Sequence, residues 1–142
     1  YAEMAAKVDA LEAHVVADST GKCLNHNDFF FLNFLIDEHD KYYLIDWEYA
    51  GMSDYANEFG TFCVCCQIDQ DEVSFALESY FGRTPTLEEA RHCLAHIQLA
   101  GWCWYVWALL KEAEGDHVGE WLYIYYSYAD KYLDRVLAMY EG

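Results

Sequence analysis

The feature that most constrains the fold is one long helical pattern in the second half of the chain. Thr86 and Glu89 have the three-residue spacing of a capping box, which begins a helix, and Gly115 is a residue type that commonly ends one. Residues 97–110 between them are almost entirely apolar. This run is shorter than the roughly 20 apolar residues of a membrane span. We therefore expect a buried core helix that reaches Glu114.

Helical patterns also cover most of the remaining chain. Apolar residues that recur every three or four positions predict a helix over residues 2–17, and a similar pattern resumes over residues 56–67. Acidic residues beginning at Asp69 favour the first turn of another helix, which Gly82 ends. A last helix is predicted over residues 118–140.

Two short apolar runs near the start of the chain have a different pattern. Residues 29–36 and 42–45 flank a polar turn, which predicts a β-hairpin, and residues 51–55 are expected to form a loop. A chain of 142 residues is enough for one domain and too short for two. We therefore expect a single domain over residues 1–142 that is mainly α, with a small β-hairpin.

The charge balance restricts the partners of the chain. It carries 25 acidic and 8 basic residues, a formal net charge of −17. Nucleic acids and anionic membrane surfaces bind clusters of Lys and Arg, so we expect neither as a partner. Most of the acidic residues are expected on solvated helix faces, and the remainder would attract a cationic substrate.

The cysteines and histidines do not predict a metal centre. The six cysteines have no CxxC spacing and no second Cys/His pair at zinc-site spacing, so we expect buried thiols. Together with the lack of an apolar leader near the start, this fits a cytoplasmic protein. Five histidines lack an acidic or cysteine partner at ligand spacing and are expected to be structural or solvated: His14, His39, His92, His96 and His117.

The most informative segment begins at His26-Asn27-Asp28. Asn33 follows Asp28 by five residues, and the second apolar run leads directly to Asp46. In phosphoryl transfer from a nucleotide, an Asp accepts the proton of the substrate hydroxyl, and an Asn and a further Asp hold the metal that bridges the phosphates. The hairpin is expected to bring Asn33 and Asp46 side by side, and their oxygens suit Mg²⁺. H-x-D alone occurs by chance, but the full spacing is a much narrower coincidence.

These residues resemble the catalytic loop and metal-binding strand of the choline/ethanolamine kinase family, which has the kinase-like fold shared with aminoglycoside phosphotransferases. The similar motifs are His26-Asn27-Asp28 and Ile45-Asp46-Trp47-Glu48-Tyr49-Ala50-Gly51, and residues 101–107 and 125–132 resemble the two late helices of that family. The resemblance implies that residues 1–142 are the helical C-terminal lobe of a protein-kinase-like fold.

The resemblance also implies a role for individual residues. Asp28 would be the catalytic base, and ATP would be the co-substrate. The Mg²⁺ ligands would be Asn33, Asp46 and Glu48, and the residues with a structural role in the catalytic loop would be His26 and Asn27.

Aromatic residues predict the class of acceptor. A quaternary ammonium has no N–H to donate, so proteins bind it with aromatic faces and diffuse negative charge. Trp104 and Trp107 lie three apart, on one face of a helix, and Tyr125 and Tyr128 repeat this spacing on the next helix. We expect Trp104, Trp107 and Tyr128 to form a box for choline, with Glu58 as the counter-charge. Alternatively, these rings are ordinary core residues.

Two other functions remain open at this stage. The acceptor could be ethanolamine or an aminoglycoside, or the chain could be a non-catalytic helical module that binds a cation or a partner. The residues before His26 predict one helix, with no glycine-rich phosphate loop, and the chain opens on Tyr1 as if cut from a longer protein. We therefore expect these 142 residues to be inactive alone. The apolar run Phe29-Phe30-Phe31 would leave a sticky surface through which homodimers could form.

Overall fold

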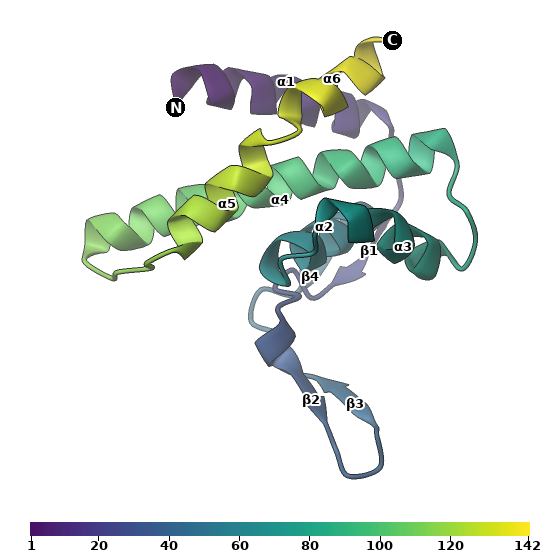
Figure 1. Ribbon diagram of the computed structural model, residues 1–142, viewed down its shortest axis with the longest axis vertical. Coiled ribbons are helices and arrows are strands. Elements are labelled where there is room, and N and C mark those ends of the chain that lie inside the picture. Colours follow the sequence, from purple (N-terminus) through teal and green to yellow (C-terminus); the bar gives the residue numbers. More distant parts are fainter.

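The computed structural model describes residues 1–142, except for the side chain of Gln70, and confirms the mainly helical fold with small β-elements (Figure 1). The strands are short and lie between the first two helices. The elements are, in chain order, α1 (Ala2–Ala17), β1 (Lys22–Asn25), the 3-10 turn η1 (Phe31–Asn33), β2 (Phe34–Ile36), β3 (Tyr42–Leu44), β4 (Gly51–Asp54), α2 (Tyr55–Cys65), α3 (Gln70–Phe81), α4 (Leu87–Glu114), α5 (Trp121–Asp130) and α6 (Leu133–Glu141).

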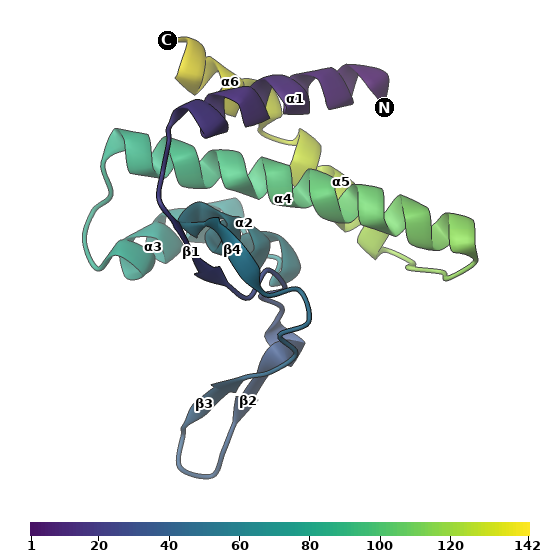
Figure 2. The same cartoon turned by 180° about the vertical axis from the view of Figure 1, so that it is seen from behind.

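Helix α4 is the centre of the molecule and packs against α1, α2, α5 and α6. Helices α1 and α6 cover one side of it, whereas α2, α3 and the strands lie on the other side (Figures 1 and 2). The predicted ends of α4 are confirmed, because the Thr86–Glu89 capping box forms and Gly115 adopts the left-handed conformation with φ 93°. By length and composition α4 could also cross a bilayer, but here its buried residues fill the core.

Two apolar clusters fill the space around α4. The cluster toward α2 and α5 includes Phe59, Cys63, Val64, Cys93, Ile97 and Tyr125. The cluster toward α1 and α6 includes Met4, Val8, Leu11, Leu133 and Val136. The expectation of buried thiols is only partly right, since Cys63, Cys65 and Cys93 are buried but Cys23 and Cys103 are exposed.

Some predicted elements differ from the structure. The loop predicted over residues 51–55 is wrong, because β4 pairs antiparallel with β1, with Asn25 opposite Gly51 and Lys22 opposite Asp54. The single last helix is also wrong, since the chain turns at residues 131–132 and divides it into α5 and α6. This turn redirects the chain so that Leu133 packs with α1 in the second cluster.

The predicted hairpin is present and extends away from the helices (Figure 1), but its first strand begins only at Phe34, because Phe31–Asn33 form the 3-10 turn η1. β2 and β3 pair antiparallel, with Phe34 opposite Leu44 and Ile36 opposite Tyr42. Several of its apolar side chains are exposed, among them Leu35, Ile36 and Tyr42. The base of the hairpin, where it meets the helical body, carries the residues of the candidate site.

Candidate active site

The first feature of the site is the pair formed by Asp28 and Asn33, at the two ends of the loop that enters the hairpin. The Asn33 side-chain Nδ2 donates to the Asp28 carbonyl oxygen at 2.9 Å and to its carboxylate Oδ2 at 3.0 Å. Asn33 is buried and Asp28 is half-buried. The amide therefore fixes both the backbone and the carboxylate of Asp28.

His26 connects the loop to the far strand of the hairpin. Its Nε2 lies 2.7 Å from the Ile45 carbonyl oxygen, and the Asp28 backbone N–H points to its Nδ1 at 3.3 Å. A carbonyl can only accept and a backbone N–H can only donate, so both contacts are satisfied by the tautomer that carries its proton on Nε2. The buried ring is thus engaged on both sides by backbone, next to Asp28.

Glu58, one turn into α2, holds the same loop from the helical body. Its Oε1 accepts the His26 N–H at 2.9 Å, and its Oε2 accepts the Asn27 N–H at 3.0 Å. Bonds of this kind, between N–H groups and a carboxylate, are stronger than bonds between neutral groups. Both oxygens of Glu58 bind the loop backbone in this structure, so its contact with a substrate stays a prediction.

Asn27 ties the start of the loop to the segment that follows the hairpin. Its φ of 64° is left-handed, a conformation that Asn tolerates better than most residues. Its Nδ2 donates to the Tyr49 carbonyl oxygen at 2.8 Å, and its Oδ1 accepts from Ser53 and Asn57. The loop and the residues after β3 are therefore joined through one side chain.

The predicted metal ligands gather at the base of the hairpin. The Ile45 N–H donates to the Asn33 carbonyl oxygen at 2.9 Å, so Asn33 lies beside the residue that precedes Asp46. Asp46 has a left-handed φ of 64°, and both Asp46 and Glu48 are exposed. Exposed carboxylates with an amide oxygen are a suitable ligand set for Mg²⁺, which keeps several of its waters.

The charges of Asp28 and Glu48 both act on the side chain of Tyr49. The negative charge of Glu48, partial burial and the charge of Asp28 raise the pKa of the Tyr49 hydroxyl, although Lys111 opposes them. The Tyr49 hydroxyl therefore lies in the electric field of both the predicted base, Asp28, and a predicted metal ligand, Glu48. A developing or bound cation at this place would be stabilised by the same two carboxylates.

Aromatic rings meet next to this segment. The ring centroids of Trp104 and Trp107 are 5.5 Å apart, and those of Trp104 and Tyr125 are 6.0 Å apart. Tyr49 meets Trp104 edge-on at 6.4 Å. A hollow of about 550 Å³ is lined by Asn27, Tyr49, Trp104 and Trp107. The aromatic rings thus border a hollow that the predicted catalytic loop also lines, through Asn27.

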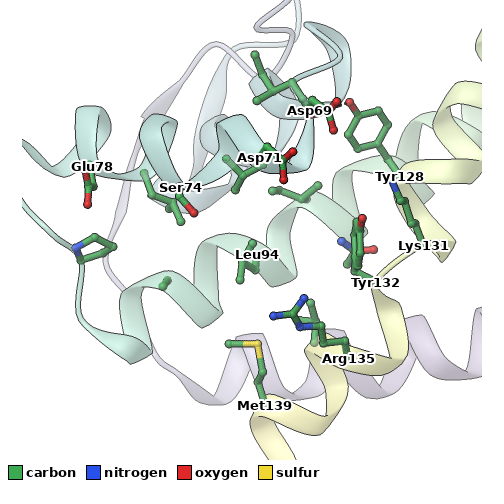
Figure 3. Close-up of a pocket in the computed structure, with 18 of the residues that line it drawn as sticks. Asp69, Asp71, Ser74, Glu78, Leu94, Tyr128, Lys131, Tyr132, Arg135 and Met139 are labelled. Carbon is green, nitrogen blue, oxygen red and sulfur yellow. Dashed lines mark hydrogen bonds between the residues drawn. The ribbon is translucent and has the colours of Figure 1, made fainter.

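Tyr128 lies elsewhere. Its hydroxyl donates to the Ile68 carbonyl oxygen at 2.9 Å, and its ring lines a larger cleft of about 810 Å³ that also contains Asp69, Lys131 and Arg135 (Figure 3). Residues three apart on α5 differ in direction by about 60°, which is enough to place Tyr125 and Tyr128 against different neighbours. The structure favours Tyr125 and Tyr49, rather than Tyr128, as the partners of the tryptophans.

Comparison with known proteins places this loop in a family. The model of the phosphotransferase enzyme family, APH, matches residues 1–95, which include the whole segment from His26 to Glu58. The chain belongs to the phosphotransferase enzyme family. It covers the C-terminal part of the family fold, in agreement with the resemblance seen in the sequence.

A curated relative and two solved structures are similar to this phosphotransferase chain. The protein LicA of Haemophilus influenzae is 28% identical over 122 residues, which are 82% of this chain and 43% of LicA. The fold resembles that of a choline/ethanolamine kinase family protein from Mesorhizobium loti, with a TM-score of 0.74 and 22% identity over 100% of this chain and 47% of the other. Choline kinase LicA from Streptococcus pneumoniae gives the same TM-score and identity over 97% of this chain and 47% of LicA. The chain thus spans less than half the length of these proteins.

Two features of this phosphotransferase chain were missed in the sequence. The two hydrogen bonds from the loop backbone to the Glu58 carboxylate join residues that are 32 and 31 positions apart in the sequence, so no local pattern reveals them. Sequence spacing indicated no acidic partner for His92, whereas the fold places Asp18 2.8 Å and Asp54 3.0 Å from its buried ring, which fits the structural role expected for it. The spacing of four between His92 and His96 was the one available signal, because it places both rings on one face of a helix.

Proposed function

We propose that this chain is the catalytic-base, Mg²⁺-binding and acceptor-binding part of an ATP-dependent choline kinase. The observation that carries this proposal is that the loop of the Asp28–Asn33 pair also contributes Asn27, the neighbour of Asp28, to the hollow lined by Tyr49, Trp104 and Trp107. A base for a hydroxyl and an aromatic wall for an ammonium group then face one acceptor. Choline has both groups within one small molecule.

The reaction follows from the roles of these residues. Asp28 accepts the proton of the choline hydroxyl while the hydroxyl oxygen of choline forms a bond to the γ-phosphorus of ATP. The bond from that phosphorus to the β–γ bridging oxygen breaks, and ADP leaves. Asn33 keeps the Asp28 carboxylate in place through its amide N–H. Asn33, Asp46 and Glu48 are the residues that would hold Mg²⁺, which supplies neutralisation of the phosphate charge when bound.

The aromatic hollow accounts for the choice of choline. The ring faces of Trp104 and Trp107 attract a cation that cannot form N–H hydrogen bonds, and the carboxylates near Tyr49 add diffuse negative charge. Support comes from the relatives, since the solved neighbours include choline kinase LicA and LicA in complex with AMP. An ethanolamine kinase from Plasmodium vivax also shares the fold, with a TM-score of 0.61 and 17% identity, so ethanolamine is the second candidate.

The proposal extends to the behaviour of the isolated chain. We propose that these 142 residues do not turn over ATP alone, because the glycine-rich loop and the Lys that cover a nucleotide are not among them. We also propose that the isolated chain forms homodimers through the run Phe29-Phe30-Phe31, of which Phe31 is exposed, together with the exposed hairpin residues Leu35 and Tyr42. We further propose that the protein acts in the cytoplasm. ATP-dependent turnover by this chain would contradict the first of these statements.

Fluorescence titration tests the choice of acceptor. Tryptophan emission is followed as choline, ethanolamine or an aminoglycoside is added, and we expect a saturable change with choline alone. The variant Trp107→Leu should abolish this change, whereas Tyr123→Leu, at an exposed position on α5, should retain it. A response to ethanolamine of equal strength would move the proposal to the second candidate. A response that survives in Trp107→Leu would exclude the aromatic hollow as the binding site.

A further inference from the structure

A second cluster of titratable side chains lies outside the catalytic loop, at the junction of β4, α2 and α4. Asp54 is the last residue of β4 and the N-cap of α2, whereas His92 and His96 lie one turn apart on α4. One ligand atom from each of the three residues lies within 4.8 Å of the others. Both histidines are buried, and Asp54 is half-buried. The cluster therefore brings three potential ligands of one ion to one place.

His92 has a carboxylate next to each of its two ring nitrogens, although a neutral imidazole carries only one proton. Asp18 Oδ2 lies 2.8 Å from His92 Nδ1, while both carboxylate oxygens of Asp54 lie 3.0 Å from Nε2. A neutral ring with its proton toward Asp18 presents a lone pair on Nε2 to a second carboxylate. This arrangement requires either a second proton on the ring or a cation between Nε2 and Asp54. A carboxylate on the outer nitrogen of a histidine is also the usual support of a metal ligand.

His96 provides an independent observation. It is 6% exposed, and neither of its ring nitrogens has a hydrogen-bond partner among the residues that the structure describes. Its Nε2 lies 3.7 Å from Asp54 Oδ1, which is too long for a hydrogen bond. Two ligands of one tetrahedral ion, each about 2.0–2.1 Å from it, lie about 3.3 Å apart. The two atoms are thus close to the separation of ligands that share an ion.

The charge states around His96 fit the same interpretation. The His96 ring is buried and neither of its nitrogens has a hydrogen-bond partner among the described residues, which favours the neutral form with a free lone pair. The Thr20 hydroxyl and the Ala56 N–H donate to the Asp54 carboxylate, which favours its ionised form. A neutral imidazole and an ionised carboxylate are the forms that bind metals.

We propose that Asp54, His92 and His96 form a binding site for a divalent transition-metal ion, with Asp18 orienting His92 from outside the ligand set. Two imidazole nitrogens and one carboxylate oxygen suit Zn²⁺ and its neighbours better than Mg²⁺ or Ca²⁺, which prefer oxygen ligands alone. This site is separate from the predicted Mg²⁺ ligands and does not depend on the proposed kinase function.

The position of the site indicates a structural role. An ion on Asp54 would join the start of α2 to α4, and Asp18 would connect it to the end of α1. Glu58, which holds the catalytic loop, lies one helical turn beyond Asp54 on α2. The site would therefore fix the base of the helix that positions the loop.

Metal titration of this chain tests the proposal. Zn²⁺ is titrated by calorimetry in the presence of millimolar Mg²⁺, which occupies the hard oxygen ligands, and Co²⁺ is used as the spectroscopic probe. We expect one equivalent of Zn²⁺ to bind with a Kd of micromolar or below. We expect Co²⁺ to give visible d–d bands without a thiolate charge-transfer band. The double variant Cys23→Ser/Cys103→Ser removes the exposed thiols and should bind equally well.

Variants locate the ion. His96→Gln should weaken Zn²⁺ binding at least 100-fold, and Asp18→Asn should weaken it about 10- to 100-fold, which is the range for outer-shell changes. His39→Gln, in the exposed turn of the hairpin, is the matched control and should leave the affinity unchanged. If His96→Gln fails to fold by circular dichroism, Asp54→Asn replaces it, because Asn still caps α2.

Three results would overturn the proposal. The first is no saturable binding of Zn²⁺ at one equivalent. The second is unchanged affinity in His96→Gln and Asp54→Asn. The third is a thiolate band with Co²⁺ that disappears in the double cysteine variant.

Discussion

The Asn33 amide donates to both the carbonyl and the carboxylate oxygen of Asp28, at 2.9 and 3.0 Å. The residue predicted to hold the metal therefore also fixes the residue predicted to act as base. If these predicted roles hold, a change at Asn33 alters both the metal site and the position of the base, whereas a change at Asp46 alters only the metal site. Variants of the two residues are for this reason not equivalent, and Asp46 gives the cleaner test.

Asp46→Asn should weaken Mg²⁺ binding to this chain. It removes one charged ligand at the base of the hairpin, and a loss of about 1.4 kcal/mol or more would lower the affinity at least tenfold. Mg²⁺ binding is measured by calorimetry, or by competition with Mn²⁺ in electron paramagnetic resonance. Asp40→Asn is the control, since Asp40 also has a left-handed φ but lies in the exposed hairpin turn. Equal losses in both variants would contradict the assignment of Asp46.

Glu58→Gln should destabilise the catalytic loop. The Gln amide can accept from only one of the two backbone N–H groups, of His26 and Asn27, and its own N–H₂ faces the other. An unsatisfied buried donor costs about 1–3 kcal/mol in the free energy of unfolding. Denaturant unfolding measures the loss, and hydrogen exchange should show faster exchange of these two amides. Glu120→Gln, at an exposed position, should change neither quantity.

Gly101→Ala should destabilise the contact between α4 and α5. A Cβ at Gly101 would lie 2.6 Å from the Ala129 backbone nitrogen and 2.9 Å from Tyr128, and backbone cannot move aside as a flexible side chain can. Overpacking of this kind costs about 1–3 kcal/mol. Gly21→Ala is the control, because no atom lies within 4 Å of its added Cβ and its φ is not positive. Equal unfolding midpoints for the two variants would contradict close packing at Gly101.

The Arg83–Glu89 pair should give α4 a pH-dependent stability. Hydrogen bonds from Arg83 and the Thr86 N–H lower the pKa of Glu89 to about 2 from an ordinary value of 4.5. The unfolded chain therefore binds more protons between these values, so the contribution is complete above pH 4.5 and is lost as the pH falls toward 2. The difference in thermal midpoint between the chain and Glu89→Gln should shrink over this interval. A difference that stays constant from pH 7 to pH 2 would refute the assignment.

Local signals predicted the helices well because capping depends on neighbours in the sequence. The capping box at Thr86 and the left-handed Gly115 place both ends of α4 correctly. The β1–β4 pair was missed because the two strands are separated by the hairpin and have little apolar alternation. Asp18, Asp54 and His92 meet only after this pairing and the packing of α1 on α4, so their contacts had no counterpart in any short window of sequence.

The aromatic hollow shows a second limit of prediction from sequence spacing. Spacing correctly placed Trp104 and Trp107 on one face of α4, since their rings are in contact. The same argument chose Tyr128, although Tyr125 recurs at the same helical spacing, and the structure places Tyr128 against Ile68 instead. The direction in which α5 crosses α4 decides that Tyr125 meets Trp104.

Asn27 donates to the carbonyl of Tyr49, 22 residues later, and so closes the chain segment that contains the hairpin at its base. The spacing of Asp28, Asn33 and Asp46 is set at this closed end and not at the tip. Chain length at the tip then becomes a nearly free variable, since doubling the length of a flexible loop costs only about 0.6 kcal/mol of closure entropy. The hairpin turn is accordingly the place where this chain would accept an insertion, a label or a grafted peptide without disturbing the loop.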